Sequence, residues 1–409
     1  MKKFFILWAS QAASLFGSAV VQFALAWYLT RETGSATVLA TALMVALIPS
    51  IVLGPFIGPF IDRWSRKKIM IFADLFIASL TLVLVILFFT KTIQIWHIYV
   101  IMAGRSIGDT FQNPALGASI PMIVPEKQLV RANGLFMMLQ NAIKIVAPIA
   151  GAFLMETLAM QWVLSVDIIT AIIAISCLIP LVIPQPPRTT LAVKADYFSD
   201  MRQGFRYIWS RPGLVMLIGM MALLIFFVAP ASSLIPVLVN QHLGGDVIKV
   251  GWLGSASGIG GILGGLTLGM WGGFKKRMWT ALLGFAIMIP CSVGLGFTSP
   301  TFFYTTTVPA MLFMGVSGAL VNAPLTAIMN AVIARDMQGR VFSLYGSIVT
   351  LMIPLGLVIG GPVADALGIR SLYFIASGAW LIILPLALIS KPLMNLENQK
   401  AVGAASPPS

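Results

Sequence analysis

The chain has 409 residues, of which 58% are hydrophobic and only 10% are charged, and its formal net charge is +13. A soluble protein ordinarily carries charge at about a quarter of its positions, so this composition excludes a water-soluble domain and indicates a polytopic membrane protein. The positive charge does not indicate a nucleic-acid partner, because the basic residues fall in turns between apolar segments, as residues that orient a membrane protein do.

Apolar segments long enough to cross about 30 Å of hydrocarbon recur along the whole chain. In chain order they lie at residues 4–29, 38–61, 69–90, 97–121, 133–157, 161–183, 213–239, 250–271, 278–298, 308–331, 342–364 and 369–390. The sequence therefore predicts an all-α fold of twelve transmembrane helices. We expect the first to remain uncleaved, because its apolar run is too long for a signal peptide.

Polar interruptions divide the predicted chain into four parts. Proline at 184, 186 and 187 ends the sixth helix, and the longest polar stretch follows. We predict an N-terminal six-helix bundle at 1–183, a cytoplasmic linker at 184–211, a C-terminal six-helix bundle at 212–390 and a cytoplasmic tail at 391–409, disordered from Glu397 onward. In the linker, apolar residues 198, 201, 205 and 208 at helical spacing indicate a helix on the anionic inner leaflet; a partner-protein docking site is the alternative.

The two predicted bundles are a duplication, because matching landmarks recur at a constant offset of 209 residues. Residues 66–68 and 275–277 are both basic, Asn113 corresponds to Asn322, and Gly151 corresponds to Gly360. Basic turns at equal offset require both units to lie in the membrane with the same orientation. With these turns inside, both termini are cytoplasmic.

The turn between the second and third segments combines an acidic residue with a basic run. Asp62 can pair with a neighbouring cation or a helix N-terminus, which would latch the cytoplasmic side. The turn resembles the signature loop of the major facilitator superfamily, with Ser65 in place of the usual second glycine. The predicted gating residues are Gly58, Asp62, Arg63, Arg66, Lys67, Lys68 and Asp74.

Charges inside the fourth segment predict a second functional feature. Arg105 and Asp109 are four residues apart and share a helix face with Gln112. Buried charge requires a partner, and a carboxylate that moves towards or away from an arginine can load and release a proton. Arg105 resembles the intramembrane arginine of the superfamily's second motif. A permanent structural ion pair is the alternative.

Three further charges in the first half complete the predicted proton-coupling set. Lys144 and Glu156 belong to the fifth segment, and Asp167 belongs to the sixth, with both acids expected in the outer portions of their helices. The equivalents of Arg105, Asp109, Lys144 and Asp167 in the second half are uncharged: Met314, Gly318, Ile353 and Ala376. Proton coupling is therefore assigned to the first half, through Arg105, Asp109, Lys144, Glu156 and Asp167.

A substrate cavity is predicted from polar helix faces. Residues 11, 14, 18 and 22 follow helical spacing on the first segment, and Phe226 offers adaptable apolar surface; ordinary membrane-core packing is the alternative. Residues 147–151 resemble the G-P-x-x-G motif of antiporters, with alanine at the first position. The predicted cavity residues are Gln22, Gln140, Asn141, Phe226, Asn322 and Thr326.

Residues 62–63, 66–71, 105–108, 113–116 and 339–344 are similar to the bacterial macrolide efflux (Mef) branch of the superfamily. The resemblance implies a transporter of the bacterial cytoplasmic membrane that exports a lipophilic small molecule of the macrolide class by proton antiport, through alternating access, with the lipid bilayer and protons as its other partners. It implies no cofactor, metal or nucleic acid, and no accessory protein is required. Two alternatives stay open: transport of lysophospholipid or another amphiphile, and a non-transporting receptor. Enzymatic activity is not expected, because no catalytic constellation and no phosphate-binding loop occurs.

Overall fold

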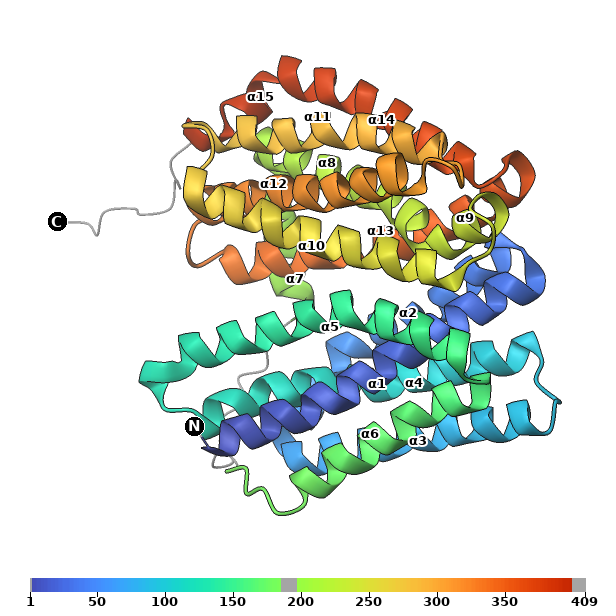
Figure 1. The fold of residues 1–409 in the computed structure, drawn as a ribbon. Coiled ribbons are helices and arrows are strands. Elements are labelled where there is room, and N and C mark those ends of the chain that lie inside the picture. The colour runs from blue at the N-terminus through green and yellow to red at the C-terminus, as the bar shows by residue number, and fades with distance from the viewer. Residues whose placement is uncertain (1, 185–196, 399–409) are drawn as a thin grey trace. The chain divides into compact units, whose positions relative to one another are not determined.

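The computed structural model describes residues 2–184 and 197–398, and the described part is helical without strands (Figure 1). Its long helices confirm the predicted fold class. They are α1 (Lys2–Thr33), α2 (Ala36–Arg63), α3 (Arg66–Phe89), α4 (Ile95–Ile123), α5 (Leu129–Thr157), α6 (Met160–Leu178), α8 (Pro212–Ser233), α10 (Val247–Trp271), α11 (Arg277–Gly296), α12 (Val308–Val332), α13 (Gln338–Leu367) and α14 (Arg370–Ile389). The short helices are η1 (Glu126–Gln128), α7 (Tyr197–Trp209), α9 (Ile235–His242), η2 (Phe303–Thr307), α15 (Lys391–Met394) and η3 (Leu396–Asn398).

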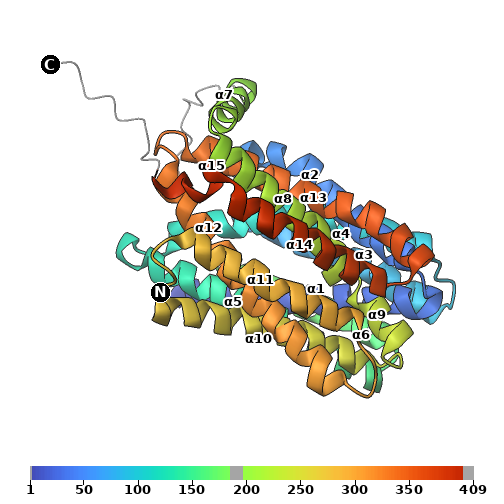
Figure 2. The ribbon, with the colours of Figure 1, turned by 90° about the horizontal axis from the view of Figure 1, so that it is seen from above.

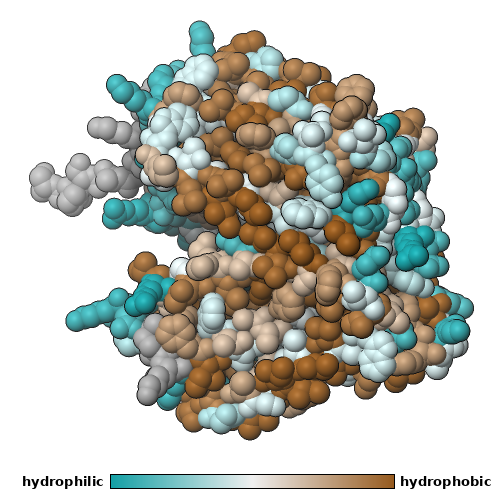
Figure 3. All heavy atoms as spheres, viewed as in Figure 1, coloured by the Kyte–Doolittle hydropathy of each residue, from teal (hydrophilic) through white to brown (hydrophobic). Residues whose placement is uncertain are grey.

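Eleven of the described helices are both long and apolar enough to cross a membrane. The remaining long helix, α4, has 29 residues, so its length suffices, but its polar side chains lower its hydropathy. Large apolar side chains such as Phe72, Phe153 and Met270 are exposed. Figure 3 shows hydrophobic residues along the helix flanks and hydrophilic residues gathered towards the helix ends, as a lipid-embedded protein requires.

The chain divides into two compact units: Met1–Thr190 with Pro236–Ser255, and Leu191–Ile235 with Ala256–Ser409. In unit 1, α1 packs against α5 and α6, α3 packs against α4 and α6, and α2 packs against α4. Glycine brings α1 close to α6, because a Cβ at Gly17 would lie 2.0 Å from Thr170 Oγ1. This close approach places the polar face of α1 against α3 and α6.

Unit 2 is built around α11, which packs against α12 and α14, while α8 packs against α13 and α14. Its core is apolar and includes Leu217, Phe285 and Trp380. The amphipathic helix α7 packs on α8 and α13 at the end of the unit where α8 begins (Figure 2). It exposes Met201 and Phe205. For residues 197–200 the structure describes the backbone only.

The seventh predicted segment, 213–239, is not one continuous helix. It breaks between Ser233 and Ile235 into α8 and α9. Pro236 stands at the start of α9 and has no N–H to donate to the preceding turn, and its ring clashes with the carbonyl four residues earlier. The sixth predicted segment also ends early, at Leu178, just before Pro180.

The predicted C-terminal tail begins with residues that pack on unit 2. Leu393 and Leu396 are buried, and Glu397 Oε1 accepts a hydrogen bond from Met278 N at 2.9 Å. The expectation of disorder from Glu397 is therefore wrong at that residue, because the carboxylate caps the first turn of α11. Residues 399–409 lie outside the described part.

Candidate functional site

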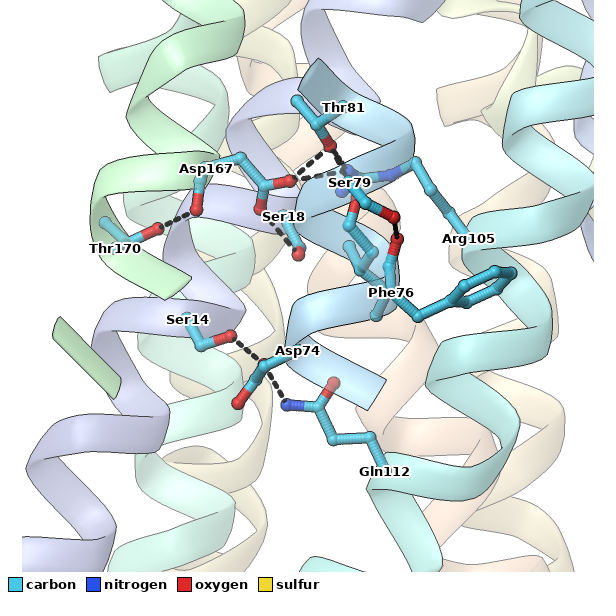
Figure 4. A network of polar contacts seen from close by, with 11 residues as sticks. Ser14, Ser18, Asp74, Phe76, Ser79, Thr81, Arg105, Gln112, Asp167 and Thr170 are labelled. Carbon is cyan, nitrogen blue, oxygen red and sulfur yellow. Dashed lines mark hydrogen bonds and ion pairs between the residues drawn. The ribbon is translucent and has the colours of Figure 1, made fainter. Parts of the chain in front are cut away.

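A polar network lies inside unit 1, where α1, α3, α4 and α6 meet (Figure 4). Its strongest contact joins Arg105 Nη1 on α4 to Asp167 Oδ2 on α6 at 2.5 Å. Arg105 is 7% exposed and Asp167 1% exposed. A buried ion pair is tolerated only when its remaining polar atoms also find partners, and the neighbouring helices supply them.

Hydroxyl groups from α1 and α3 complete the surroundings of Asp167. Ser18 Oγ donates to Asp167 Oδ1 at 2.9 Å, and Thr81 Oγ1 donates to Asp167 Oδ2 at 2.7 Å. Arg105 Nη1 also donates to Thr81 Oγ1. Four helices therefore hold one carboxylate, and any change in its charge acts on all four.

The position of Asp167 corrects one expectation. It stands near the middle of α6, not in its outer portion, and it takes the arginine that was expected to act with Asp109. Asp109 is half-buried one turn along α4 from Arg105, and among the described residues it makes neither a hydrogen bond nor an ion pair. The structure thus supplies Arg105 with one engaged carboxylate and one unengaged carboxylate.

Asp74 forms a second polar group in the same network. Its Oδ1 accepts hydrogen bonds from Ser14 Oγ and Gln112 Nε2, both at 2.7 Å. Gln112 Nε2 also donates to Gln11 Oε1 at 3.1 Å. Asp74 was expected to act with the gating turn; its hydrogen bonds instead run to α1 and α4 in the interior of unit 1.

The gating turn is shaped by its own local contacts. Ser65, which replaces the family's glycine, is the N-cap of α3 and accepts from Lys68 N. Lys67 Nζ donates to Ile179 O at 2.5 Å, which satisfies a carbonyl at the end of α6. Arg66 is buried, Gly58 is exposed, and the side chains of Asp62 and Arg63 lie outside the described part.

The structure does not bring the other predicted coupling residues to this network. Lys144 and Glu156 are exposed on α5, and neither makes a hydrogen bond or ion pair to Arg105 or Asp167 within the described ranges. The antiporter-like segment of α5 instead contacts the first turns of α10, which belong to unit 1. A Cβ at Gly251 would lie 3.0 Å from Pro148 O, and Ser255 Oγ donates to Ile145 O at 2.6 Å.

The predicted cavity residues are mostly exposed on their own units. Gln22, Gln140 and Asn141 are exposed in unit 1, Asn322 and Thr326 in unit 2, and Phe226 is partly buried against Phe227. Gln11 and Ser14 were also expected to line the cavity, but both are buried in the network of unit 1.

Sequence reasoning missed two features of unit 1. One is the role of Thr81, whose only signal is its position seven residues after Asp74 on the same face of α3. The other is an apolar groove of about 530 Å³ between α3 and α4, lined by Trp64, Lys68, Phe72, Phe76, Ile107 and Phe111. Of its lining residues, Lys68 belongs to the predicted gating set, and none belongs to the predicted proton-coupling or cavity sets.

Comparisons with known proteins give consistent results. A family profile described as "Major Facilitator Superfamily" matches residues 7–357 and 231–407. The chain is 32% identical over 393 residues to Macrolide efflux protein A of Streptococcus pyogenes, covering 96% of both chains. It is 24% identical over 418 residues to Multidrug efflux pump Tap of Mycolicibacterium fortuitum, covering 98% of this chain and 97% of that one.

Solved structures with the same fold are more distant in sequence. A bacterial homologue of the iron transporter ferroportin in an inward-facing state has a TM-score of 0.74 at 14% identity, over 97% of this chain and 98% of that one. A D-xylose-proton symporter has a TM-score of 0.69 at 12% identity, over 96% and 99% of the two chains. At these identities the likeness concerns the fold alone.

Proposed function

The chain belongs to the major facilitator superfamily, and from this premise we propose that it exports macrolide-type antibiotics from the bacterial cytoplasm by proton antiport and alternating access. The substrate class is supported by end-to-end similarity to a relative named for macrolide efflux. The ion coupling is supported by the buried pair of Arg105 and Asp167, which is the observation that carries the proposal.

Protonation of Asp167 is the proposed coupling step. A proton that binds the carboxylate removes its charge and leaves Arg105 without a counter-ion in a low-dielectric interior. Asp109, one turn away on α4 and without a hydrogen bond or close ion pair among the described residues, then becomes the better partner for the guanidinium. Because Ser18, Thr81 and Arg105 all bind Asp167, this exchange alters contacts among α1, α3, α4 and α6.

The energy available from this step suffices for a gradient of drug. Moving one elementary charge through 100 mV is worth about 2.3 kcal/mol, and about 1.4 kcal/mol corresponds to a tenfold concentration ratio. One proton per cycle can therefore sustain a ratio of more than tenfold. The proposal places the protein in the cytoplasmic membrane with both termini inside, where the proton gradient drives export.

Drug accumulation in whole cells tests the proposed function. Expression in a macrolide-sensitive bacterium is expected to lower the accumulation of labelled macrolide and to raise resistance, and a protonophore is expected to abolish both effects. Cells that express Asp167→Asn should accumulate as much drug as cells without the protein. Cells that express Asp336→Asn, a substitution in the exposed turn before α13, should accumulate as little drug as cells with the wild-type protein. Unchanged accumulation with the wild-type protein would refute macrolide export.

The amphiphile alternative has a direct readout in the same membranes. Inverted vesicles containing the protein can be supplied with labelled lysophospholipid and a pH gradient. Protein-dependent movement of the lipid, together with no movement of macrolide, would replace the proposed substrate.

A further inference from the structure

Asp74 is a buried carboxyl that contacts no cation of the described part of the chain. It is 1% exposed, and the side chains around it, Gln11 and Gln112, are 0% and 2% exposed. Its Oδ1 accepts hydrogen bonds from Ser14 and Gln112, both neutral donors. Its Oδ2 has no hydrogen-bond partner. The site thus differs from Asp167, whose charge is balanced by Arg105.

Among the side chains that the structure describes, no charge near Asp74 compensates for an ionised carboxylate. On α4 the charged groups are Arg105, which is engaged with Asp167, and Asp109. On α6 the one charged residue is Asp167, and on α1 charges occur only at the helix ends, as do the cations at the N-terminus of α3. Since an unpaired buried charge costs several kcal/mol, a proton on this carboxyl would remove an uncompensated charge from the interior of unit 1.

The same site contains a donor that the ionised form can use. Gln11 Nε2 is buried and lies near Asp74, but among the described residues it makes no hydrogen bond of normal geometry. The carbonyl of the same amide accepts a hydrogen bond from Gln112, which also donates to Asp74. An adjacent unpaired acceptor and donor can meet when Asp74 releases its proton. The carboxylate would then accept from Ser14, Gln112 and Gln11, which makes both protonation states accessible.

The two acids lie along one seam of unit 1. Ser14 binds Asp74 and Ser18 binds Asp167, and these serines are four residues apart on α1, about 6 Å along the axis. Asp74 and Thr81, which also binds Asp167, lie on α3 with Asp74 nearer the gating turn. Asp74 is therefore the acid closer to the predicted cytoplasmic end.

We propose that Asp74, with Ser14, Gln11 and Gln112, is a second proton-binding site of the transport cycle, which takes up one proton on its carboxylate and releases it on the cytoplasmic side. The inference rests on the proposed function, because it assigns two titrating acids to one coupled cycle. It follows that neutralising Asp74 alone uncouples transport while the pair of Arg105 and Asp167 stays intact.

Infrared titration of the purified protein in lipid tests the proton site directly. Wild type is expected to show the carbonyl band of a protonated carboxyl that disappears as the pH is raised, and Asp74→Asn should lack this component. Asp336→Asn, the same substitution at an exposed turn, should retain it. A band that is unchanged in Asp74→Asn would overturn the assignment.

Transport by the same proteins in proteoliposomes tests the place of Asp74 in the cycle. Asp74→Asn is expected to bind macrolide and to carry it down its own gradient, but not to accumulate it when a pH gradient is imposed. Asp74→Glu, which keeps a titrating acid, should retain part of the driven transport, so a general folding defect is distinguished. Full pH-driven transport by Asp74→Asn would disprove the role. If the wild-type protein moves no macrolide, that result refutes macrolide export. The infrared titration still decides whether Asp74 binds a proton.

Discussion

Arg105 is held by more contacts than a single ion pair would give it. It binds Asp167 and Thr81 together, and Ser18 binds the other oxygen of the same carboxylate. In a dry interior each of these groups is costly when it stands alone. The network is therefore stable as a whole and sensitive to the loss of any charged member.

Loss of the cation alone is expected to destabilise unit 1. Arg105→Leu leaves Asp167 buried without a counter-ion, although Ser18 and Thr81 still donate to it, and breaking a buried pair in this way costs about 3–5 kcal/mol. The loss should grow as the pH rises, because protonation at low pH removes the uncompensated charge. Thermal unfolding in detergent across a pH series measures this. The double variant Arg105→Leu/Asp167→Leu should recover most of the stability, and a double variant no more stable than the single one would contradict the account.

The identity of the partner of Arg105 could not be read from the sequence. Spacing along one helix indicates Asp109, because residues four apart share a face. The actual partner comes from α6, and that contact depends on how closely α1, α3 and α6 approach, which Gly17 permits. The sequence did indicate that the charged residues inside the membrane belong to the first half, because a charged residue within a long apolar segment can be recognised directly from the sequence.

At the scale of helices, close packing in unit 2 depends on glycines of α10 and α12. A Cβ at Gly260 would lie 1.9 Å from Leu312 O, and a Cβ at Gly315 would lie 2.0 Å from Ser257 O. These approaches are reciprocal and involve backbone, which cannot move aside as a flexible side chain can. Small residues are what permits such contact between helices in a membrane.

Alanine substitutions on adjacent positions of α10 test this packing. Gly260→Ala is expected to destabilise the protein by an amount at the upper end of the about 1–3 kcal/mol that overpacking usually costs. Gly261→Ala is the matched control, because a Cβ there meets no atom within 4 Å. Thermal unfolding of both variants in detergent provides the comparison, and equal stability would show that the helices are not in close contact at Gly260.

The glycine pattern illustrates where sequence reasoning about helices stops. Four-residue spacing favours three contact pairs: Gly254 with Gly258, Gly261 with Gly265, and Gly265 with Gly269. A Cβ at Gly254 would lie 3.3 Å from Pro148 Cβ, yet a Cβ at Gly261, Gly265 or Gly269 meets nothing within 4 Å. The contact face uses Gly260 and Gly264, one position earlier, where backbone atoms of α12 lie close. Spacing along a helix shows which residues share a face, but it does not show which face contacts the partner helix. That depends on the structure of the partner helix.

At the scale of the whole molecule, the duplicated halves differ in what fills their interiors. The counterpart of Asp167 is Ala376, which is fully buried in the apolar core of unit 2. Helix number and order were predictable because long apolar segments and basic turns are local signals. The packing of Leu393 and Leu396 depends on contacts within unit 2, which local signals do not contain, whereas the break at Pro236 follows from the proline itself.

The duplication makes a prediction about sidedness that single cysteines can test. With Cys177 and Cys291 replaced by serine, Lys68→Cys and Lys275→Cys lie in equivalent basic turns, so both should react with an impermeant maleimide only in inverted vesicles. Lys91→Cys, in the turn between α3 and α4, should react only in intact cells. All three lysines are exposed, so accessibility depends on the side of the membrane. If the cysteines at positions 68 and 275 reacted from opposite sides of the membrane, the two halves would be inverted repeats. The parallel duplication would then be wrong, and so would the cytoplasmic placement of the gating turn, which depends on it.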